Sequence, residues 1–266
     1  MAAVETVLSR ARDAGRPSLV TYVTGGIRAD WTDLVAAMAD AGADAVEIGV
    51  PFSDPMLDGP VIQQASATAI GRGATTARIL AGLAPAAARG VPLIAMAYAN
   101  HAWSRGFSRY CRDLADAGIS GTIIPDLPVG EADDYLAAAS AAGLDATLMV
   151  SPATPPGQLR LIASRSRGFL YVMSVMATTG TTWSSDHSGR WAVADQARRC
   201  SSRPVLIGFG IDTPGRAAAA ARSADGVIVA SALMRRVLDG ATAAEIGRAV
   251  AGVRAAIDVT VGAGGQ

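Results

Sequence analysis

The chain has 266 residues, half of them hydrophobic, and its 23 basic and 23 acidic residues give a formal net charge of zero. That is enough apolar sequence for one sizeable hydrophobic core. No cluster of basic residues indicates binding to nucleic acid, and no apolar run approaches the roughly 20 residues that a membrane-spanning helix needs. The sequence contains no lysine, which excludes mechanisms that need a lysine Schiff base.

The first element in the chain is a predicted helix. The segment MAAVETVLSRARDAG mixes charged residues into an apolar pattern, which is typical of an amphipathic helix and not of a signal peptide. Eight short apolar runs follow, each with the near-continuous hydrophobic character of a strand buried on both faces. These predicted strands are 19–25, 45–50, 93–98, 122–127, 146–151, 169–174, 205–210 and 227–232.

Helical patterns separate the predicted strands. Trp31, Leu34, Val35 and Met38 have the spacing of one helix face, as do residues of the segment 107–114. Gly42, Gly118 and Gly143 end Ala-rich stretches where only glycine adopts the left-handed conformation cheaply. A last helix carries Ile246, Val250, Val253 and Ile257, and we expect residues 260–266 to form a flexible tail.

Eight β–α units in this length predict a single-domain (β/α)8 TIM barrel over residues 1–266, with an extra N-terminal helix and a short helix after the eighth strand. A doubly wound sheet is the alternative, although such sheets more often have five or six strands. The barrel prediction places active-site groups at the C-terminal ends of the strands.

Glu47 is an unusual residue for a buried strand. Val46, Ile48 and Val50 share one face of the strand, so Glu47 shares the other face with Ala45 and Gly49 and should point into the barrel. Burial raises the pKa of a carboxyl group, which suits proton transfer near neutral pH. The alternative is a structural role, either in an ion pair with a buried arginine or in hydrogen bonds. No arginine occurs in the eight predicted strands, which disfavours the ion pair.

Asp58 follows in the segment SDPMLDGP, after the second strand. An aspartate before glycine is usually part of a turn. Beside Glu47, however, it makes a pair of carboxylates in different environments, which can divide acid and base roles.

A phosphate site is predicted after the last two strands. The segment GFGI (208–211) follows the seventh strand, and ASALM (230–234) follows the eighth and opens a short helix. Barrels often bind phosphate there with backbone N–H groups and a helix N-terminus. Tight turns without a ligand are the alternative.

Two further groups of residues are candidates for parts of the active site, and a third group, the cysteines, is not. Residues 174–189 after the sixth strand are small and polar and resemble a mobile lid, or else an ordinary surface loop. Aromatic residues near strand ends can form the wall of a ring-shaped apolar pocket or simply belong to the core: Tyr22, Tyr98, Tyr171 and Phe209. Two cysteines, Cys111 and Cys200, form no metal or redox motif, so we expect free thiols in a cytoplasmic protein, with no metal and no cofactor.

The segment VEIGVPFSDPMLDGP resembles the tryptophan synthase alpha subunit family. YVTGG, YANHAWSRG, IIPDLP, GFLYVMS, GFGI and DGVIVASA also resemble segments of that family, in the same order, so the likeness covers roughly residues 1–255. The resemblance implies a TIM barrel that cleaves indole-3-glycerol phosphate to indole and glyceraldehyde 3-phosphate. It also implies a partner, the tryptophan synthase beta subunit, in an alpha2beta2 complex through residues 51–60 and 174–189.

The resemblance also implies roles for individual residues. Glu47 is the general acid and base, Asp58 is the partner of the indole nitrogen, and Thr179 contacts Asp58 when the lid closes. The phosphate is bound by Gly180, Gly208, Gly210, Ala230 and Ser231, and the indole ring by Tyr22, Tyr98, Tyr171 and Phe209.

The chain departs from the family pattern at a few positions. The lid reads ATTG where GVTG is usual, Ala230 replaces a glycine, and Tyr22 replaces a phenylalanine. The alternatives to the alpha-subunit function are a stand-alone lyase that releases free indole and a weakly catalytic regulatory partner of a beta subunit. A different phosphate-binding barrel of aromatic amino-acid biosynthesis is a further alternative.

Overall fold

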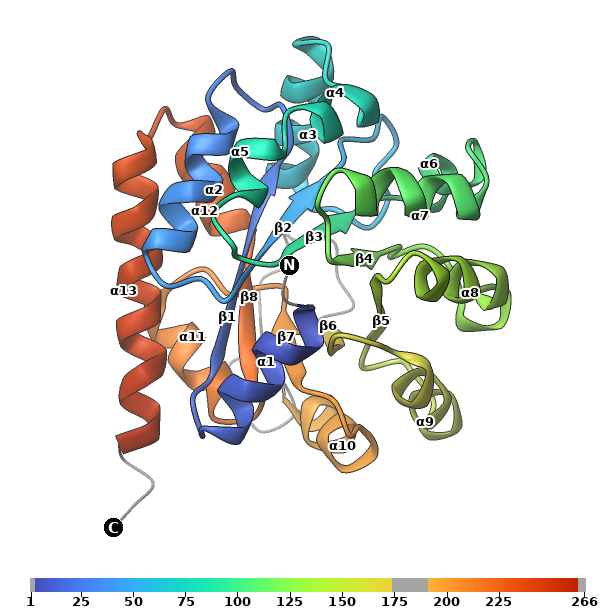
Figure 1. Cartoon of the computed structure of the whole chain (residues 1–266). Helices are drawn as coiled ribbons and strands as arrows, with labels where there is room; N and C mark the ends of the chain where they lie inside the picture. The colour runs from blue at the N-terminus through green and yellow to red at the C-terminus, as the bar shows by residue number, and fades with distance from the viewer. Residues whose placement is uncertain (1–2, 174–190, 263–266) are drawn as a thin grey trace.

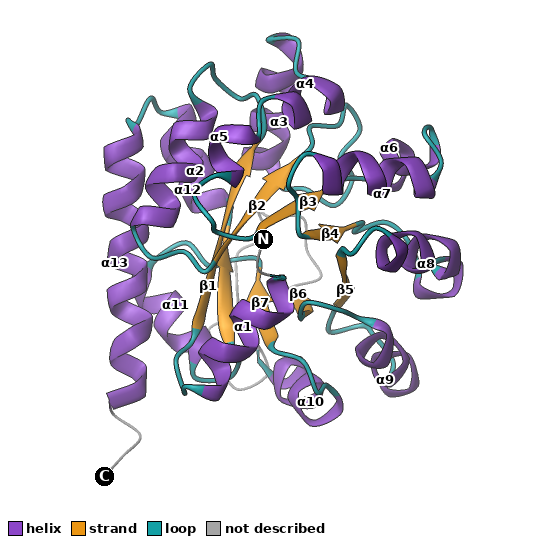
Figure 2. Cartoon of the chain, viewed as in Figure 1, coloured by secondary structure: helices purple, strands orange, loops and turns teal. Residues whose placement is uncertain are grey.

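The structure of the protein is a computed structural model, which describes residues 3–173 and 191–262. Eight parallel strands close a barrel in chain order, and helices surround it (Figures 1 and 2). Each strand pairs with its neighbours in sequence, and β8 returns to β1. The predicted (β/α)8 barrel is therefore confirmed, and the doubly wound alternative is wrong.

Six strands are shorter than the apolar runs that predicted them, whereas β1 and β5 keep the predicted length and begin one residue earlier. They are β1 (Ser18–Thr24), β2 (Ala45–Gly49), β3 (Leu93–Met96), β4 (Gly121–Ile123), β5 (Asp145–Val150), β6 (Leu170–Met173), β7 (Val205–Gly208) and β8 (Gly226–Val229). The largest difference is at β4, predicted over 122–127. Pro125 has no N–H for a ladder bond, so the chain leaves the sheet before it.

Helices cover the outside of the barrel. Those before β5 are α1 (Val4–Asp13), α2 (Trp31–Asp40), α3 (Pro60–Gly71), α4 (Thr76–Ala81), α5 (Ala84–Ala87), α6 (Ala99–Trp103), α7 (Phe107–Asp116), the 3-10 helix η1 (Val129–Glu131) and α8 (Asp133–Ala141). Those after β5 are α9 (Pro156–Arg165), α10 (Ala192–Cys200), α11 (Pro214–Ala221), α12 (Ser231–Leu238) and α13 (Ala243–Gly262). The expected helix after the eighth strand is α12.

Local signals placed several of these helices correctly. Trp31, Leu34, Val35 and Met38 are the buried residues of α2. The predicted glycines Gly42, Gly118 and Gly143 all have positive φ. The last helix, α13, ends at Gly262, and residues 263–266 lie outside the described residues, so a flexible tail there stays a prediction.

The core has two parts, one between the strands and the helices and one inside the barrel. The interior cluster includes Val20, Ala45, Ile94 and Phe169, and also Val4 and Leu8 of α1. Helix α1 therefore closes the N-terminal end of the barrel, across which it lies in Figure 1. A Cβ at Gly121 would come within 2.9 Å of Val4, so this glycine leaves room for α1. The N-terminal end is thus sealed, which leaves the C-terminal end for a ligand.

Candidate active site

Glu47 lies inside the barrel, as its strand alternation predicted. It is the third residue of β2 and is paired in register with Tyr22 of β1 and Ile94 of β3. Only 1% of the residue is exposed to solvent. The residue therefore contributes a carboxyl group to a site shielded from water.

The environment of Glu47 favours its protonated form. Burial raises the pKa of Glu47 from 4.5 to about 8. Among the described residues, its Oε1 atom has no hydrogen-bond partner, and no ion pair includes Glu47. The alternative of a structural ion pair thus finds no support in this part of the chain, and a buried polar atom without a partner is a common sign of a functional site.

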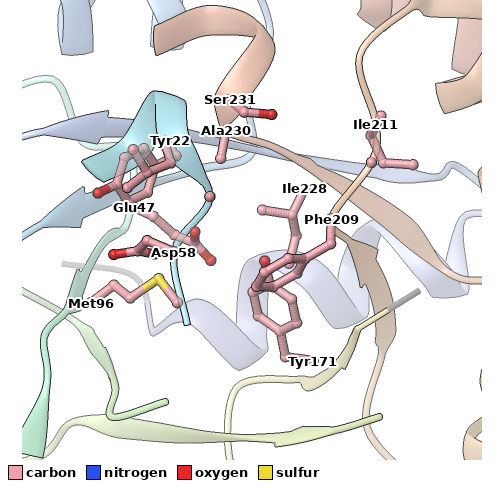
Figure 3. Close-up of a pocket in the computed structure, with 13 residues that line it drawn as sticks. Tyr22, Glu47, Asp58, Met96, Tyr171, Phe209, Ile211, Ile228, Ala230 and Ser231 are labelled. Atoms are coloured by element: carbon pink, nitrogen blue, oxygen red, sulfur yellow. The ribbon is translucent and has the colours of Figure 1, made fainter. Parts of the chain in front are cut away.

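Asp58 lies in the same pocket, in the loop between β2 and α3. Burial raises the pKa of Asp58 to about 6, and a hydrogen bond from the Tyr98 hydroxyl lowers it in part. The loop is fixed near this residue, because the Asp58 amide donates to the Pro55 carbonyl at 3.1 Å and Gln63 Nε2 donates to the Asp58 carbonyl at 2.8 Å. Figure 3 shows Glu47 and Asp58 close together at one side of the pocket. One pocket thus contains two carboxyl groups with different pKa values.

Aromatic side chains face these carboxyl groups. Tyr22, Tyr171 and Phe209 line the pocket, and the rings of Tyr171 and Phe209 meet edge to face with centroids 6.0 Å apart. Burial, followed by the neighbouring charges of Glu47 and Asp58, raises the pKa of the Tyr171 hydroxyl. In Figure 3 Tyr171 and Phe209 lie across the pocket from Glu47 and Asp58, and Tyr22 lies beside the two carboxyl groups. An apolar pocket with a carboxyl group at one side suits a flat ring with a polar N–H group.

Tyr98 has a different place from the other predicted aromatic residues. It is buried but is not among the residues that line the pocket. Its hydroxyl accepts a hydrogen bond from the Leu57 amide at 3.0 Å and donates one to the Asp58 carboxylate. Tyr98 thus contacts the Asp58 loop from outside the pocket.

The end of the pocket that was predicted to bind phosphate is formed by the loops that leave β7 and β8. Gly210, Ala230 and Ser231 line the pocket there, and Ser231 is the first residue of α12. Phe209 has φ of 68°, an uncommon conformation for a residue with a side chain, and Gly210 has φ of 69°. Backbone strain of this kind concentrates at ligand sites.

Gly208 has a local reason to be glycine. A Cβ there would lie 2.2 Å from the Tyr171 hydroxyl, and Gly208 is not among the lining residues. In the same way, a Cβ at Gly49 would lie 1.8 Å from the Tyr22 hydroxyl. These two glycines make room for the aromatic side chains, a role that the sequence pattern did not suggest.

Two predicted site residues, Thr179 and Gly180, lie outside the described residues, together with the whole segment 174–189. Conversely, the sequence analysis missed five residues that line the pocket: Gly59, Ile62, Met96, Ile211 and Ile228. The alternation of β3 and β8 could have identified Met96 and Ile228 as inward-facing. No local signal indicates Ile62, because a loop brings α3 against the pocket.

The described residues form neither a metal site nor a membrane-spanning helix. Within 3–173 and 191–262, no group of three or more His, Cys, Asp or Glu residues could hold a metal ion. In that same part of the chain, no helix has the length and apolar character needed to cross a membrane.

Comparisons with known proteins agree with this geometry. A family model described as tryptophan synthase alpha chain matches residues 8–256. The tryptophan synthase alpha chain of Geobacter sulfurreducens is 38% identical over 98% of this chain and 100% of its own length. That of Nitratidesulfovibrio vulgaris is 41% identical over 92% of this chain and 96% of its own length.

Solved structures give the same result. A structure of Mycobacterium tuberculosis tryptophan synthase has a TM-score of 0.88 and 31% identity, covering 97% of this chain and 99% of the other. A tryptophan synthase subunit alpha from Legionella pneumophila has a TM-score of 0.86 and 29% identity, covering 97% of this chain and 99% of the other.

Proposed function

The chain belongs to the tryptophan synthase alpha chain family, and on that premise we propose that Glu47 and Asp58 carry out its chemistry. The protein is a lyase that cleaves indole-3-glycerol phosphate in tryptophan biosynthesis, the role of the alpha subunit.

The reaction is a retro-aldol cleavage with indole as the leaving group. A proton is added to C3 of the indole ring, which places a positive charge on the ring system. A base removes the proton of the side-chain hydroxyl next to the C3–carbon bond, the bond breaks, and its electrons return to the ring as the aldehyde forms. The atoms balance without a metal ion or a lysine.

Glu47 is the proposed general acid and base. With its pKa raised to about 8, it is largely protonated at neutral pH and can donate a proton to C3. The carboxylate that results can accept the proton of the hydroxyl. The single observation that best supports this role is the Oε1 atom of Glu47, which is buried in the pocket without a partner among the described residues.

Asp58 is the proposed partner of the ring nitrogen. With its pKa near 6, it is ionised at neutral pH and can stabilise the positive charge that develops on the ring. Tyr22, Tyr171 and Phe209 would contact the indole ring. Thr179 would contact Asp58, as the family resemblance implies.

The phosphate group would bind at the opposite end of the pocket. Gly210 lies there in the loop after β7, and Ala230 and Ser231 lie at the N-terminus of α12, where backbone N–H groups and the helix dipole favour an anion. Gly180 and Gly208 are proposed from the family resemblance alone.

A tryptophan synthase beta subunit is the proposed partner, in an alpha2beta2 complex. The docking surface is residues 51–60, referred to below as loop 2, together with residues 174–189. Met56 of loop 2 is 73% exposed, an uncommon exposure for a large apolar residue and one that a partner would cover. The comparisons do not favour the two alternatives, a stand-alone indole-releasing lyase and a regulatory partner. We place the protein in the cytoplasm, because both described cysteines are free thiols.

An indole-release assay tests this proposal. The purified chain is supplied with indole-3-glycerol phosphate while its cognate beta subunit is titrated in, and complex formation is followed separately. We expect a slow basal rate that rises at least about tenfold on complex formation, the usual scale of coupling between sites. A high basal rate with no complex would contradict the partner and support a stand-alone lyase.

A further inference from the structure

Asp126 belongs to the segment IIPDLP, which has no role in the mechanism above. It follows β4, and its Oδ1 atom accepts a hydrogen bond from the Ala99 amide at 2.8 Å. Ala99 lies after β3 and is the first residue of α6. Asp126 therefore links the C-terminal ends of two neighbouring strands through one bond.

The first amide of a helix has no acceptor within the helix. The residue before α6 is Tyr98, and its side chain does not cap the helix. Asp126 supplies the missing acceptor from another strand. A carboxylate in this position makes a charge-assisted hydrogen bond and interacts favourably with the helix dipole.

Tyr98 transmits this restraint to the catalytic loop. Its hydroxyl contacts both the Leu57 amide and the Asp58 carboxylate. Its ring stacks on Phe52 with centroids 5.1 Å apart, and Phe52 also meets His101 of α6 at 5.5 Å. Loop 2 therefore contacts Tyr98 near both its start and its end, and it also contacts α6 near its start.

We propose that Asp126 is a positioning residue for the lyase reaction, which acts through Ala99 and Tyr98 to place the Asp58 carboxylate. The inference rests on the function proposed for Asp58. A helix cap that served only stability would not act through Tyr98, so the effect of removing it would not depend on the Tyr98 hydroxyl.

The test is a double-mutant cycle on the full chain with saturating beta subunit. We expect Asp126→Ala to lower kcat about tenfold, within the range of a lost charge-assisted bond, and to leave KM within about twofold. Asp126→Asn should recover most of the rate, because its amide oxygen can accept the same bond. In a Tyr98→Phe background, Asp126→Ala should cost less than about twofold, since contacting residues are not additive.

The pH profile gives a readout that a purely structural cap would not change. The Tyr98 hydrogen bond lowers the pKa of Asp58, so loss of this bond raises that pKa. The acid limb of kcat should consequently move to higher pH in Tyr98→Phe, and in the same direction in Asp126→Ala. Asp134→Ala, which removes an exposed aspartate of α8, is the matched control and should leave both rate and profile unchanged.

Equal losses from Asp126→Ala in both backgrounds, or an unmoved acid limb, would overturn the inference. Asp58→Asn, measured alongside, separates this failure from that of the proposed function. If Asp58→Asn is fully active, the role of Asp58 is wrong. If Asp58→Asn is impaired but Asp126→Ala is not, only the role of Asp126 is wrong.

Discussion

Asp44 and Glu47 lie three residues apart, one just before β2 and the other within it, and their surroundings are opposite. Asp44 accepts hydrogen bonds from Arg16, from Arg254 Nη1 at 3.2 Å and from the Leu19 amide at 2.8 Å. Glu47 has no ion pair among the described residues, and its Oε1 atom has no partner. The first carboxylate joins α13 to the barrel, whereas the second is left available for a substrate.

The difference has an energetic consequence. Bonded partners offset the cost of burying a carboxylate, whereas a buried carboxyl group without partners opposes folding when it is ionised. Because the pKa of Glu47 is about 8 in the folded state and near 4.5 when exposed, its contribution to stability is present below pH 4.5 and is lost as the pH rises to 8. The buried Glu47 carboxyl group thus costs stability at neutral and higher pH.

Glu47→Gln should have the largest effect on the reaction. Removing the general acid and base should lower kcat by at least ~10². The same change should stabilise the fold at pH 8 by on the order of a few kcal/mol, with little effect at pH 4.5. Steady-state kinetics and urea unfolding at both pH values measure the two effects, with Glu131→Gln as an exposed control. Near-normal turnover in a folded variant would remove Glu47 from the mechanism.

Asp58→Asn should come next. It should lower kcat by about 10², because the charge on the ring develops only in the transition state, while affinity for a phosphate-bearing ligand survives. The wild-type rate should fall below a pH of about 6, where Asp58 becomes protonated. The variant should lack this acid limb. A variant that lost ligand affinity and kept its turnover would contradict the assigned role.

Asp44→Ala tests the carboxylate that has bonded partners. It should lower the free energy of unfolding by about 2 kcal/mol, between the scales for exposed and for buried ion pairs, without a change in kcat at temperatures where the protein is folded. Asp113→Ala breaks an exposed pair with Arg105 and should cost less than about 1 kcal/mol. Equal unfolding midpoints of the two variants in urea would contradict the role of Asp44 in joining α13 to the barrel.

Ser231→Ala should have the smallest effect. Loss of one hydrogen bond to the phosphate should raise KM about fivefold, equivalent to about 1 kcal/mol, with kcat nearly unchanged. Indole-3-glycerol without phosphate should be a poor substrate, and the variant should prefer the phosphorylated substrate less than the wild type does. An unchanged preference would place the phosphate elsewhere.

Much of this structure was readable from local patterns. Eight apolar runs predicted eight strands, and the position of Glu47 between Val46 and Ile48 predicted that it points inward. The order of strands and loops predicted that Asp58, Gly210 and Ser231 meet at one end of the barrel. These inferences succeed because side-chain alternation and helix periodicity are properties of the backbone over a few residues.

Only the tertiary structure decided how distant segments meet. It placed α1 as the closure of the barrel, Tyr98 outside the pocket against Asp58, and Asp126 at the amide of Ala99. It also explains why residue 208 is a glycine, because a Cβ there would clash with the hydroxyl of Tyr171 on the neighbouring strand. These contacts depend on strand register, barrel closure and loop path. Such features are set by packing between elements far apart in the chain, so no short stretch of sequence contains them.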